Sequence, residues 1–337
     1  MSAFFLSAAS LPRALTTIVT GVAIAGVMTL VGCGAGEEGR GARPAVDADA
    51  AMASNTTRAA ADRNAGQGPS LGVDDYGSPI DTGRRAQRIV SLNPTTTEIL
   101  FALGAGGQLV GRSRWDQWPV EAHSIPALGD AIRPSVEQVL AARPDLVVLY
   151  ASGDNRAAAS AFAAAGVRVV ALRVDRIADF ERCVRVMGAV SGHAEAARLA
   201  IDSVTRSLEA VRVAMGGGGR VRVFLHVWDN PLMAIGGGSF MSELVDIAGG
   251  RNVYADLAEP SPQVSFEDLM RRDPDAILAG PLEVVRLSRE PRWRALRAVR
   301  ERRVLAYDTT LVARPSMRLG EAARSLAKLL HPSADVR

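Results

Sequence analysis

Two of the chain's four tryptophans, Trp115 and Trp118, lie in one short polar segment, residues 114–119. An indole in a polar loop presents a broad apolar face beside water, and such faces suit a wide, flat ligand. Packing within the protein is the alternative, and we expect at least one of the two indoles to pack beneath the loop beside Pro119. The segment is a candidate aromatic wall of a ligand site.

A second set of candidate ligand contacts follows a predicted strand at residues 221–227. Trp228 and Asp229 come directly after that strand, and the carboxyl ends of strands in α/β sheets face the ligand cleft. Arg314, in the later loop 309–318, offers a guanidinium that could hold an anionic group such as a carboxylate-bearing ferric chelate or a haem propionate. A surface ion pair with an acid such as Glu321 is the alternative role for Arg314.

Catalytic and metal-binding patterns are missing from the sequence. There is no Ser-His-Asp order, no nucleophile elbow and no metal-ligand cluster, and residues 236–238 lack both the Walker lysine and the spacing of the dinucleotide fingerprint. The four histidines are far apart. Only His226 lies on a strand that approaches the cleft, and a core or rim position explains it more simply. We therefore expect no enzyme activity and no resident metal or cofactor.

Composition supports a globular protein. Hydrophobic residues make up 48% of the 337 residues, charged residues make up 22%, and the formal net charge is +3. The arginines are scattered through predicted helices, and no basic stripe is interleaved with aromatic residues, so nucleic acid is not an expected partner. The length suits two ordinary domains.

One helix-to-strand pattern occurs twice, at residues 135–149 and 265–279. Each copy reads Ser, one residue, Glu, a short helix, Pro-Asp and an apolar strand. The serine hydroxyl can cap the helix, and the proline ends it. Two copies of one unit predict two similar α/β lobes, and a cleft between such lobes is where a small ligand usually binds.

Strands alternate with helices before residue 175 and after residue 217, which indicates parallel sheets. Between them, residues 194–215 contain no Gly or Pro and carry apolar residues at helical spacing. At 1.5 Å per residue they would form a helix of roughly 33 Å. A single lobe does not need so long a helix, so we expect a rigid connection between two lobes and only a small closure on ligand.

The N-terminus has the features of a processing segment. Residues 14–31 form an apolar run that ends at Leu30-Val31-Gly32-Cys33. This ending resembles a bacterial lipobox, in which the cysteine becomes acylated and starts the mature chain. A transmembrane anchor of about 18 residues is the alternative. The other cysteine, Cys183, lies on an amphipathic segment and is predicted to be a buried small hydrophobe.

These patterns divide the chain into five parts. We predict a lipoprotein signal peptide over residues 1–33, a disordered tether over 34–86, an N-terminal α/β lobe over 87–175, a helical segment with the interlobe helix over 176–216, and a C-terminal α/β lobe over 217–332. Folded structure is expected to start at Arg88.

The order of these segments resembles the substrate-binding proteins of ABC importers for cobalamin and ferric siderophores, the class III family with a helical backbone. The resemblance covers residues 88–332 and is carried by IVSLNPTTTEILFALG, VGRSRWDQWP, PSVEQVLAARPDLVV, the long helix, GGGSFMSELVDIAGGRNVYADL and PQVSFEDLM. It implies an α/β fold with two Rossmann-like lobes that have parallel sheets, joined by one long rigid helix. It also implies a monomer without enzyme activity, anchored by lipid in the periplasm or at the cell surface.

The resemblance assigns the two glutamates of the repeat. In this family an acidic residue on each lobe meets arginines of the ABC permease, and Glu137 and Glu267 stand at those positions. A carboxylate in the first turn of a helix is also favoured by the helix dipole. A capping role without a partner is the alternative.

The resemblance also bears on the ligand. Trp115 and Trp118 match aromatic positions of the cobalamin binders, which favours cobalamin or a related corrinoid. The loop aromatics often found elsewhere in those proteins are replaced by Ser261, Leu311 and Val312, so a ferric siderophore or haem is the alternative within the family. For haem, His226 would be the candidate axial ligand. A lipoprotein that binds only other proteins is a further alternative, against which the aromatic loop argues.

Overall fold

The computed structural model of the protein describes residues 71–334. The predicted signal peptide, the predicted acylation site Cys33 and the predicted tether up to residue 70 lie outside the described residues. Within them, no helix combines the length and the apolar character needed to cross a membrane.

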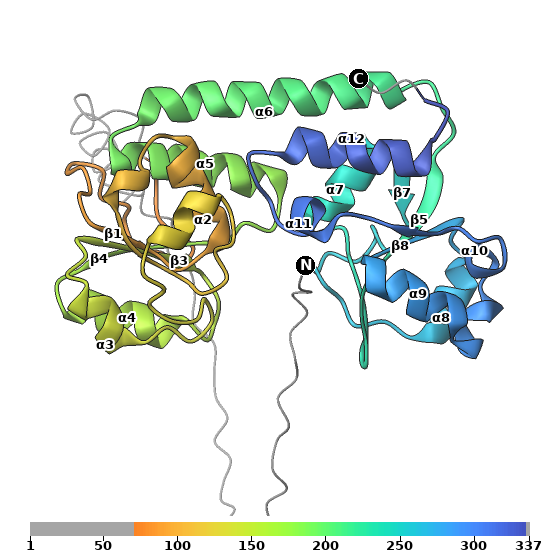
Figure 1. Cartoon of the computed structure of the whole chain (residues 1–337), viewed down its shortest axis with the longest axis horizontal. Coiled ribbons are helices and arrows are strands. Elements are labelled where there is room, and N and C mark those ends of the chain that lie inside the picture. The colour runs from red at the N-terminus through yellow and green to blue at the C-terminus, as the bar shows by residue number, and fades with distance from the viewer. Residues whose placement is uncertain (1–70, 335–337) are drawn as a thin grey trace, which may run out of the picture. The chain divides into compact units, whose positions relative to one another are not determined.

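The first lobe is a four-stranded parallel sheet with helices on both faces (Figure 1). The strand order is β2-β1-β3-β4, so the chain starts at a central strand and crosses over. Its elements are β1 (Ile89–Ser91), α2 (Pro94–Ala102), β2 (Leu109–Arg112), α3 (Val136–Ala141), β3 (Leu146–Tyr150), α4 (Arg156–Ala164) and β4 (Arg168–Leu172).

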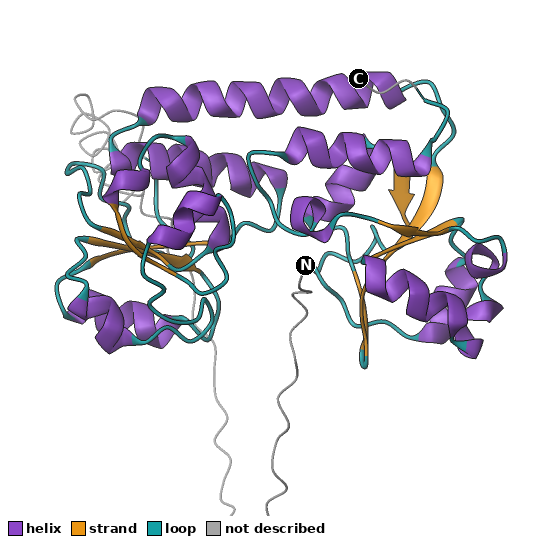
Figure 2. Ribbon diagram, viewed as in Figure 1, coloured by secondary structure: helices purple, strands orange, loops and turns teal. Residues whose placement is uncertain are grey.

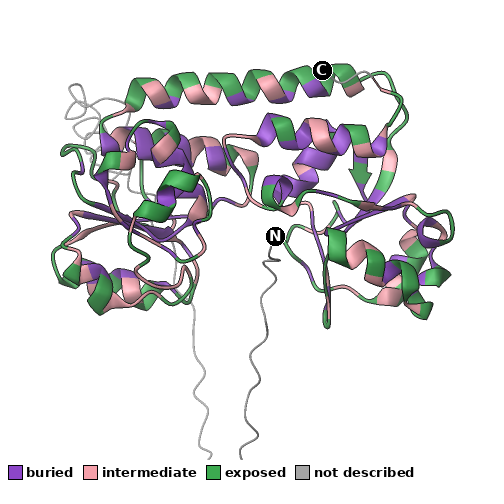
Figure 3. Ribbon diagram, viewed as in Figure 1, coloured by how far each residue is buried: buried purple, intermediate pink, exposed green. Residues whose placement is uncertain are grey.

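Alternation along the strands sorts the side chains of this sheet into two cores. One face of the sheet packs against α2 and against α5 (Ile177–Ser191), and it carries Ile89, Leu146 and Val148. The other face packs against α3 and α4, and it carries Val90 and Val147. All five are fully buried or nearly so, and Figure 3 shows buried residues along the strands of this lobe. The sheet is therefore covered on both faces, as parallel sheets are.

Two helices lead out of the first lobe. They are α5 (Ile177–Ser191), which ends at Gly192 with a positive φ of 77°, and α6 (Ala194–Met215), a single helix of 22 residues. The buried stripe of α6 is Ala197, Val204, Leu208 and Val211, and it packs on α5 and on the C-terminal helix.

The second lobe contains a five-stranded mixed sheet (Figure 2). Four strands run in the order β6-β5-β8-β9, and β7 pairs with the start of β5. Its elements are β5 (Val221–Asp229), β6 (Leu232–Ala234), α7 (Phe240–Ile247), β7 (Gly250–Asn252), α8 (Phe266–Arg272), β8 (Ala276–Ala279), α9 (Pro281–Arg289), α10 (Arg297–Arg300), β9 (Val304–Ala306), α11 (Thr309–Val312) and α12 (Leu319–Leu330).

The structure confirms two α/β lobes joined by one long helix and adds details that the sequence pattern did not give. The antiparallel strand β6 and the helix α9 were not expected. Between α9 and β9 the chain forms a 3₁₀ turn, Pro291–Ala295, and the short α10. The strand expected to end at Val227 continues to Asp229.

Both copies of the repeat fold as predicted. Ser135 accepts a hydrogen bond from the Gln138 amide at 3.4 Å, and Ser265 accepts one from the Asp268 amide at 3.0 Å. The hydroxyls thus cap α3 and α8. Each repeat then continues into the buried strand of its lobe, β3 or β8.

The predicted tether was wrong for its last sixteen residues, 71–86. Asp74 is buried, and its carboxylate accepts hydrogen bonds from the amides of Tyr76, Ser78 and Ala171. The Ala86 amide donates to the Val190 carbonyl at 2.7 Å. These backbone bonds make residues 71–86 part of the first lobe, so its folded structure begins before Arg88. The other domain limits remain a proposal.

Candidate functional site

A pocket of about 330 Å³ lies at the carboxyl-terminal edge of the first sheet. It forms where β1 and β3, adjacent in the sheet, run out into loops. The lining is mostly apolar and contains no lysine or arginine: Leu92, Asn93, Pro94, Ala131, Ile132, Tyr150, Ser152, Asp154 and Asn155. Such a pocket favours an apolar, uncharged part of a ligand over an anionic one.

Asn155 holds the loops around this pocket together. Its side chain is buried, and its Nδ2 donates to the Ala131 carbonyl at 2.9 Å and to the Tyr150 carbonyl at 3.0 Å. The Tyr150 hydroxyl in turn donates to Asp175 at 2.7 Å. The pocket is therefore largely pre-formed, although none of its residues was singled out from the sequence.

Trp115 stands next to this pocket. Its Nε1 donates to Asp130 Oδ1 at 3.2 Å, and the same oxygen accepts the Ile132 amide at 3.0 Å. Arg114 forms an ion pair with Asp130 at 2.9 Å and lies 5.7 Å above the Trp115 ring. Asp130 thus ties the half-buried indole to a residue that lines the pocket.

Trp118 is the more exposed indole, with 45% of its surface accessible. The guanidinium of Arg318, from the second lobe, lies 5.6 Å from its ring centroid, a cation–π distance. The structure therefore gives the two indoles different surroundings: Trp115 is partly packed, as expected of one of them, and Trp118 remains open to a ligand.

The loop that carries both indoles is anchored by Asp116. This carboxylate is fully buried and accepts hydrogen bonds from the Thr97 hydroxyl at 2.5 Å and from the Ser113 hydroxyl. The Thr97 hydroxyl has one proton, so donating it to Asp116 leaves Ser91, at 2.8 Å, as the donor to Thr97. Burial raises the pKa of Asp116, and the two hydroxyl donors counteract part of that rise.

In the second lobe, Trp228 and Asp229 are on the last residues of β5. Trp228 is 42% exposed, and its Nε1 donates to the Asn230 carbonyl at 3.0 Å. Asp229 is already engaged, because Arg286 and Arg292 form ion pairs with it and His226 Nε2 lies 3.2 Å away. Burial would raise the pKa of Asp229, but its hydrogen bonds with Arg286 and His226 lower it overall.

His226 is buried in the core rather than presented to a ligand. It packs edge-to-face against Phe224 and Trp293, and burial lowers its pKa even though the contact with Asp229 favours the charged form. The structure thus gives it the core position that the sequence made the simpler explanation.

Arg314 turns toward the first lobe. Its Nε lies 3.8 Å from Glu98 on α2, whose carboxylate is buried and also accepts the Met317 amide at 3.3 Å. The Thr95 hydroxyl donates to the Pro315 carbonyl at 3.1 Å. The acid partner expected for Arg314 is present, but it is Glu98, while Glu321 pairs with Arg318 at 2.7 Å.

The two glutamates of the repeat are exposed at equivalent places, in the first turns of α3 and α8. Among residues 71–334, neither Glu137 nor Glu267 forms an ion pair. The carboxylate beside Glu267 behaves differently, because Asp268 binds Arg271 and Arg272. The free carboxylates are those that occur in both copies of the repeat.

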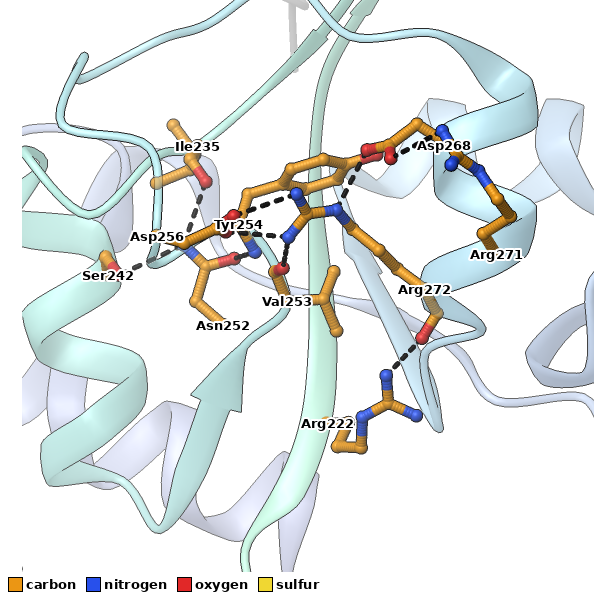
Figure 4. Close-up of polar contacts among 10 residues, drawn as sticks. All are labelled: Arg222, Ile235, Ser242, Asn252, Val253, Tyr254, Asp256, Asp268, Arg271 and Arg272. Carbon is orange, nitrogen blue, oxygen red and sulfur yellow. Dashed lines mark hydrogen bonds and ion pairs between the residues drawn. The ribbon is translucent and has the colours of Figure 1, made fainter.

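A polar network fixes the position of α8 (Figure 4). Arg272 forms ion pairs with Asp256 at 2.6 Å and with Asp268 at 2.8 Å, and its guanidinium stacks 4.3 Å from the Tyr254 ring. Arg222, on β5, donates to the Arg272 carbonyl. The helix that presents Glu267 is thus bound both to the sheet and to the segment after β7.

Over the described range 71–334, no group of three or more His, Cys, Asp or Glu side chains could hold a metal ion. Burial raises the pKa of the Cys183 thiol to about 12, which leaves it a packed, unreactive group as predicted. The arrangement therefore offers surfaces and hydrogen bonds to a ligand rather than a reacting centre.

Comparisons with known proteins agree with this picture. A family model described as "Periplasmic binding protein" matches residues 89–311. A vitamin B12-binding protein of Salmonella paratyphi A is 31% identical over 248 residues, which are 73% of this chain and 90% of that protein. A vitamin B12-binding protein of Yersinia pestis is 31% identical over 197 residues, 57% of this chain and 69% of that protein.

Solved structures share the fold. A periplasmic vitamin B12-binding protein of Vibrio cholerae superposes with a TM-score of 0.64 at 24% identity, covering 73% of this chain and 96% of that one. A periplasmic haem-binding protein of Roseiflexus, in its apo form, gives a TM-score of 0.66 at 25% identity and covers 73% and 98%.

Proposed function

Because the chain belongs to the periplasmic binding protein family, we propose that it is the substrate-binding component of an ABC importer that captures cobalamin or a related corrinoid. It is a binding protein and not an enzyme, and its ligand is cargo rather than a cofactor. The bound corrinoid is handed to the membrane permease unchanged. Anchoring through an acylated Cys33 is part of the same proposal.

The pocket at the edge of the first sheet is the observation that carries the choice of ligand. Its lining is mostly apolar and contains no cation, and its one acidic side chain, Asp154, is exposed. A corrin has apolar faces and uncharged amides around its rim, which such a surface and the exposed Trp118 indole can cover. The vitamin B12-binding relatives support the same ligand.

An anionic chelate finds fewer partners at these edges. A haem propionate or an iron-bound carboxylate would call for a free guanidinium. Arg114, Arg314 and Arg318 already face Asp130, Glu98 and Glu321 respectively. At these three arginines such a ligand would compete with an acid that is already present, so we take haem and ferric siderophores as the weaker candidates.

Calorimetric titration of the protein with cyanocobalamin, haem and a ferric hydroxamate tests the ligand. We expect saturable binding of cyanocobalamin and at least tenfold weaker binding of the other two, since one misplaced polar contact costs about 1.4 kcal/mol or more. Ile132→Asp, which puts a charge at the pocket, should weaken cyanocobalamin binding. Val120→Asp is the matched control, because Val120 is 63% exposed and does not line the pocket. Binding of haem but not of cyanocobalamin would reject the corrinoid assignment.

Delivery to the permease is proposed to depend on Glu137 and Glu267. Their exposure, their repeated position and their lack of an ion-pair partner within residues 71–334 support this role. The double variant Glu137→Arg with Glu267→Arg should bind ligand normally but fail to restore uptake in cells that lack the wild-type protein. A double variant at two other exposed glutamates, Glu121→Arg with Glu259→Arg, controls for the change in charge. Normal uptake through the first variant would remove the docking role.

A further inference from the structure

A second, larger pocket lies in the C-terminal lobe, at the edge of the sheet where β9 begins. Its volume is about 720 Å³. It is lined by residues from α9, α10 and the segments next to them: Ser288, Arg294, Val299, Arg300, Arg302 and Val304. The strand β9 runs from this pocket toward Tyr307, so the pocket is at the amino-terminal edge of the sheet and not at the edge that faces the proposed ligand.

Three of the six lining residues are arginines, and no carboxylate of residues 71–334 forms an ion pair with them. The acids nearest in sequence form ion pairs with other arginines. Glu290 pairs with Arg286 and Arg292, and Glu301 pairs with Arg297. The pocket therefore keeps three positive charges without a countercharge from the described protein. Like charges held together repel, and a bound anion would relieve that repulsion.

Hydrogen bonds orient one of these arginines, and a second has an unusual backbone conformation. Arg300 donates from Nη1 to the carbonyls of Ala295 at 2.5 Å and of Arg294 at 3.3 Å, which holds its guanidinium over the end of the 3₁₀ turn. Arg302 has a positive φ of 58°, a conformation that costs a residue with a side chain energy and that glycine adopts freely. An arginine is thus kept where a glycine would be easier to accommodate.

We propose that this pocket is an anion site that takes a phosphate group, either free or on the headgroup of an anionic lipid. A phosphate has several oxygens, and planar guanidinium groups from different directions can each donate to one of them. The site is independent of corrinoid binding, because it shares no residue with the pocket of the first lobe.

The test uses the whole protein with two probes. Sedimentation with phosphatidylglycerol vesicles, with phosphatidylcholine vesicles as the uncharged reference, measures binding to a lipid headgroup. Titration with inorganic phosphate and pyrophosphate measures binding of a free anion. We expect binding to at least one probe, and we expect it to weaken as salt is raised.

Arg302→Gly is the informative variant, because glycine suits the positive φ and the fold should be kept or stabilised. It should weaken binding by about two- to fivefold, the usual effect of one arginine near an anionic group. Arg143→Gly is its matched control: Arg143 is likewise exposed and has a positive φ of 47°, yet it lies in the other lobe.

Each outcome decides the proposal. Binding of free phosphate or pyrophosphate that Arg302→Gly weakens supports a site for a soluble anion. Binding only to phosphatidylglycerol, with the same dependence on Arg302, supports a headgroup site. Binding to neither probe, or equal weakening by Arg302→Gly and Arg143→Gly, would overturn the pocket as a specific site.

Discussion

Replacing Asp116 by asparagine should weaken the proposed corrinoid binding, although the Asp116 side chain is fully buried and is not presented to a ligand. The side chain is fully buried and joins the indole loop to α2 through Thr97 and to the start of the loop through Ser113. Asparagine has the same shape but offers one acceptor oxygen, and its amide nitrogen must face a hydroxyl that was a donor. One charge-assisted hydrogen bond is lost, and one donor is left without an acceptor.

The size of the effect follows from those bonds. A hydrogen bond to a charged group contributes about 1.5–3 kcal/mol, so the loop should lose about that much of the free energy that orders it. When the binding-competent form of a loop becomes partly populated, the apparent dissociation constant rises by the inverse of that population. Once the ordered loop is no longer the dominant form, each further 1.4 kcal/mol of lost loop stability raises the apparent dissociation constant about tenfold. We expect Asp116→Asn to raise it by at least about that factor.

The assay combines cyanocobalamin titration with acrylamide quenching of tryptophan fluorescence. Asp74→Asn is the matched control, because Asp74 is another buried carboxylate of the first lobe but holds residues 71–86 instead of the indole loop. Both variants should be destabilised to urea, whereas only Asp116→Asn should bind weakly and show a more accessible Trp118. Unchanged affinity in Asp116→Asn, or an equal loss in Asp74→Asn, would refute the reasoning.

Three other predictions follow from the described contacts. Burial raises the pKa of Glu98 despite Arg314 and the Met317 amide, so the folded state holds this proton more tightly and stability should decline as pH rises from about 4. The urea midpoint of Glu98→Gln should change less with pH than that of the wild-type protein. An equal dependence on pH in both proteins would contradict this. Leu208→Ala in the buried stripe of α6 should cost about 2–5 kcal/mol of unfolding free energy, and Leu199→Ala, at a position 54% exposed, should cost less than about 0.5 kcal/mol in the same denaturant series. Small-angle scattering of the apo and cyanocobalamin-bound protein should give nearly superimposable curves, and a clear contraction on binding would show that the junction around α6 hinges.

The repeat and the long helix could be predicted because their signals are local. Ser135 and Ser265 precede apolar residues at helical spacing, and a proline ends each helix, so capping and termination are written within fifteen residues. The helix 194–215 was predicted to the residue, since nothing within it breaks a helix and glycines follow it.

The pocket of the first lobe could not be predicted in the same way. Leu92 and Ser152 are sixty residues apart in the sequence. They line one pocket because the strands that they follow, β1 and β3, are neighbours in the sheet, an order that the sequence does not state. Residues 71–86 were misjudged for a related reason. Their composition is that of a linker, but Asp74 folds them by accepting main-chain bonds, including one from Ala171 almost a hundred residues away.

The distribution of the apolar cores predicts a stiff connection between the lobes and more mobile loops at the carboxyl-terminal edges of the sheets. One apolar core contains α5, α6, α7 and α12 together with one face of each sheet, and two further cores lie on the other faces. Bending between the lobes would expose part of the shared core, at about 25 cal/mol for each Å² of apolar surface. The edge loops carry no such cost, because Trp118 and Ile132 are exposed and lie outside these cores. The contacts of Glu98 with the Met317 amide and of Trp118 with Arg318 join the first lobe to the segment that leads into α12. If α3 and α8 dock a permease as proposed, ligand binding should therefore be signalled by the ordering of these edge loops rather than by closure of the lobes.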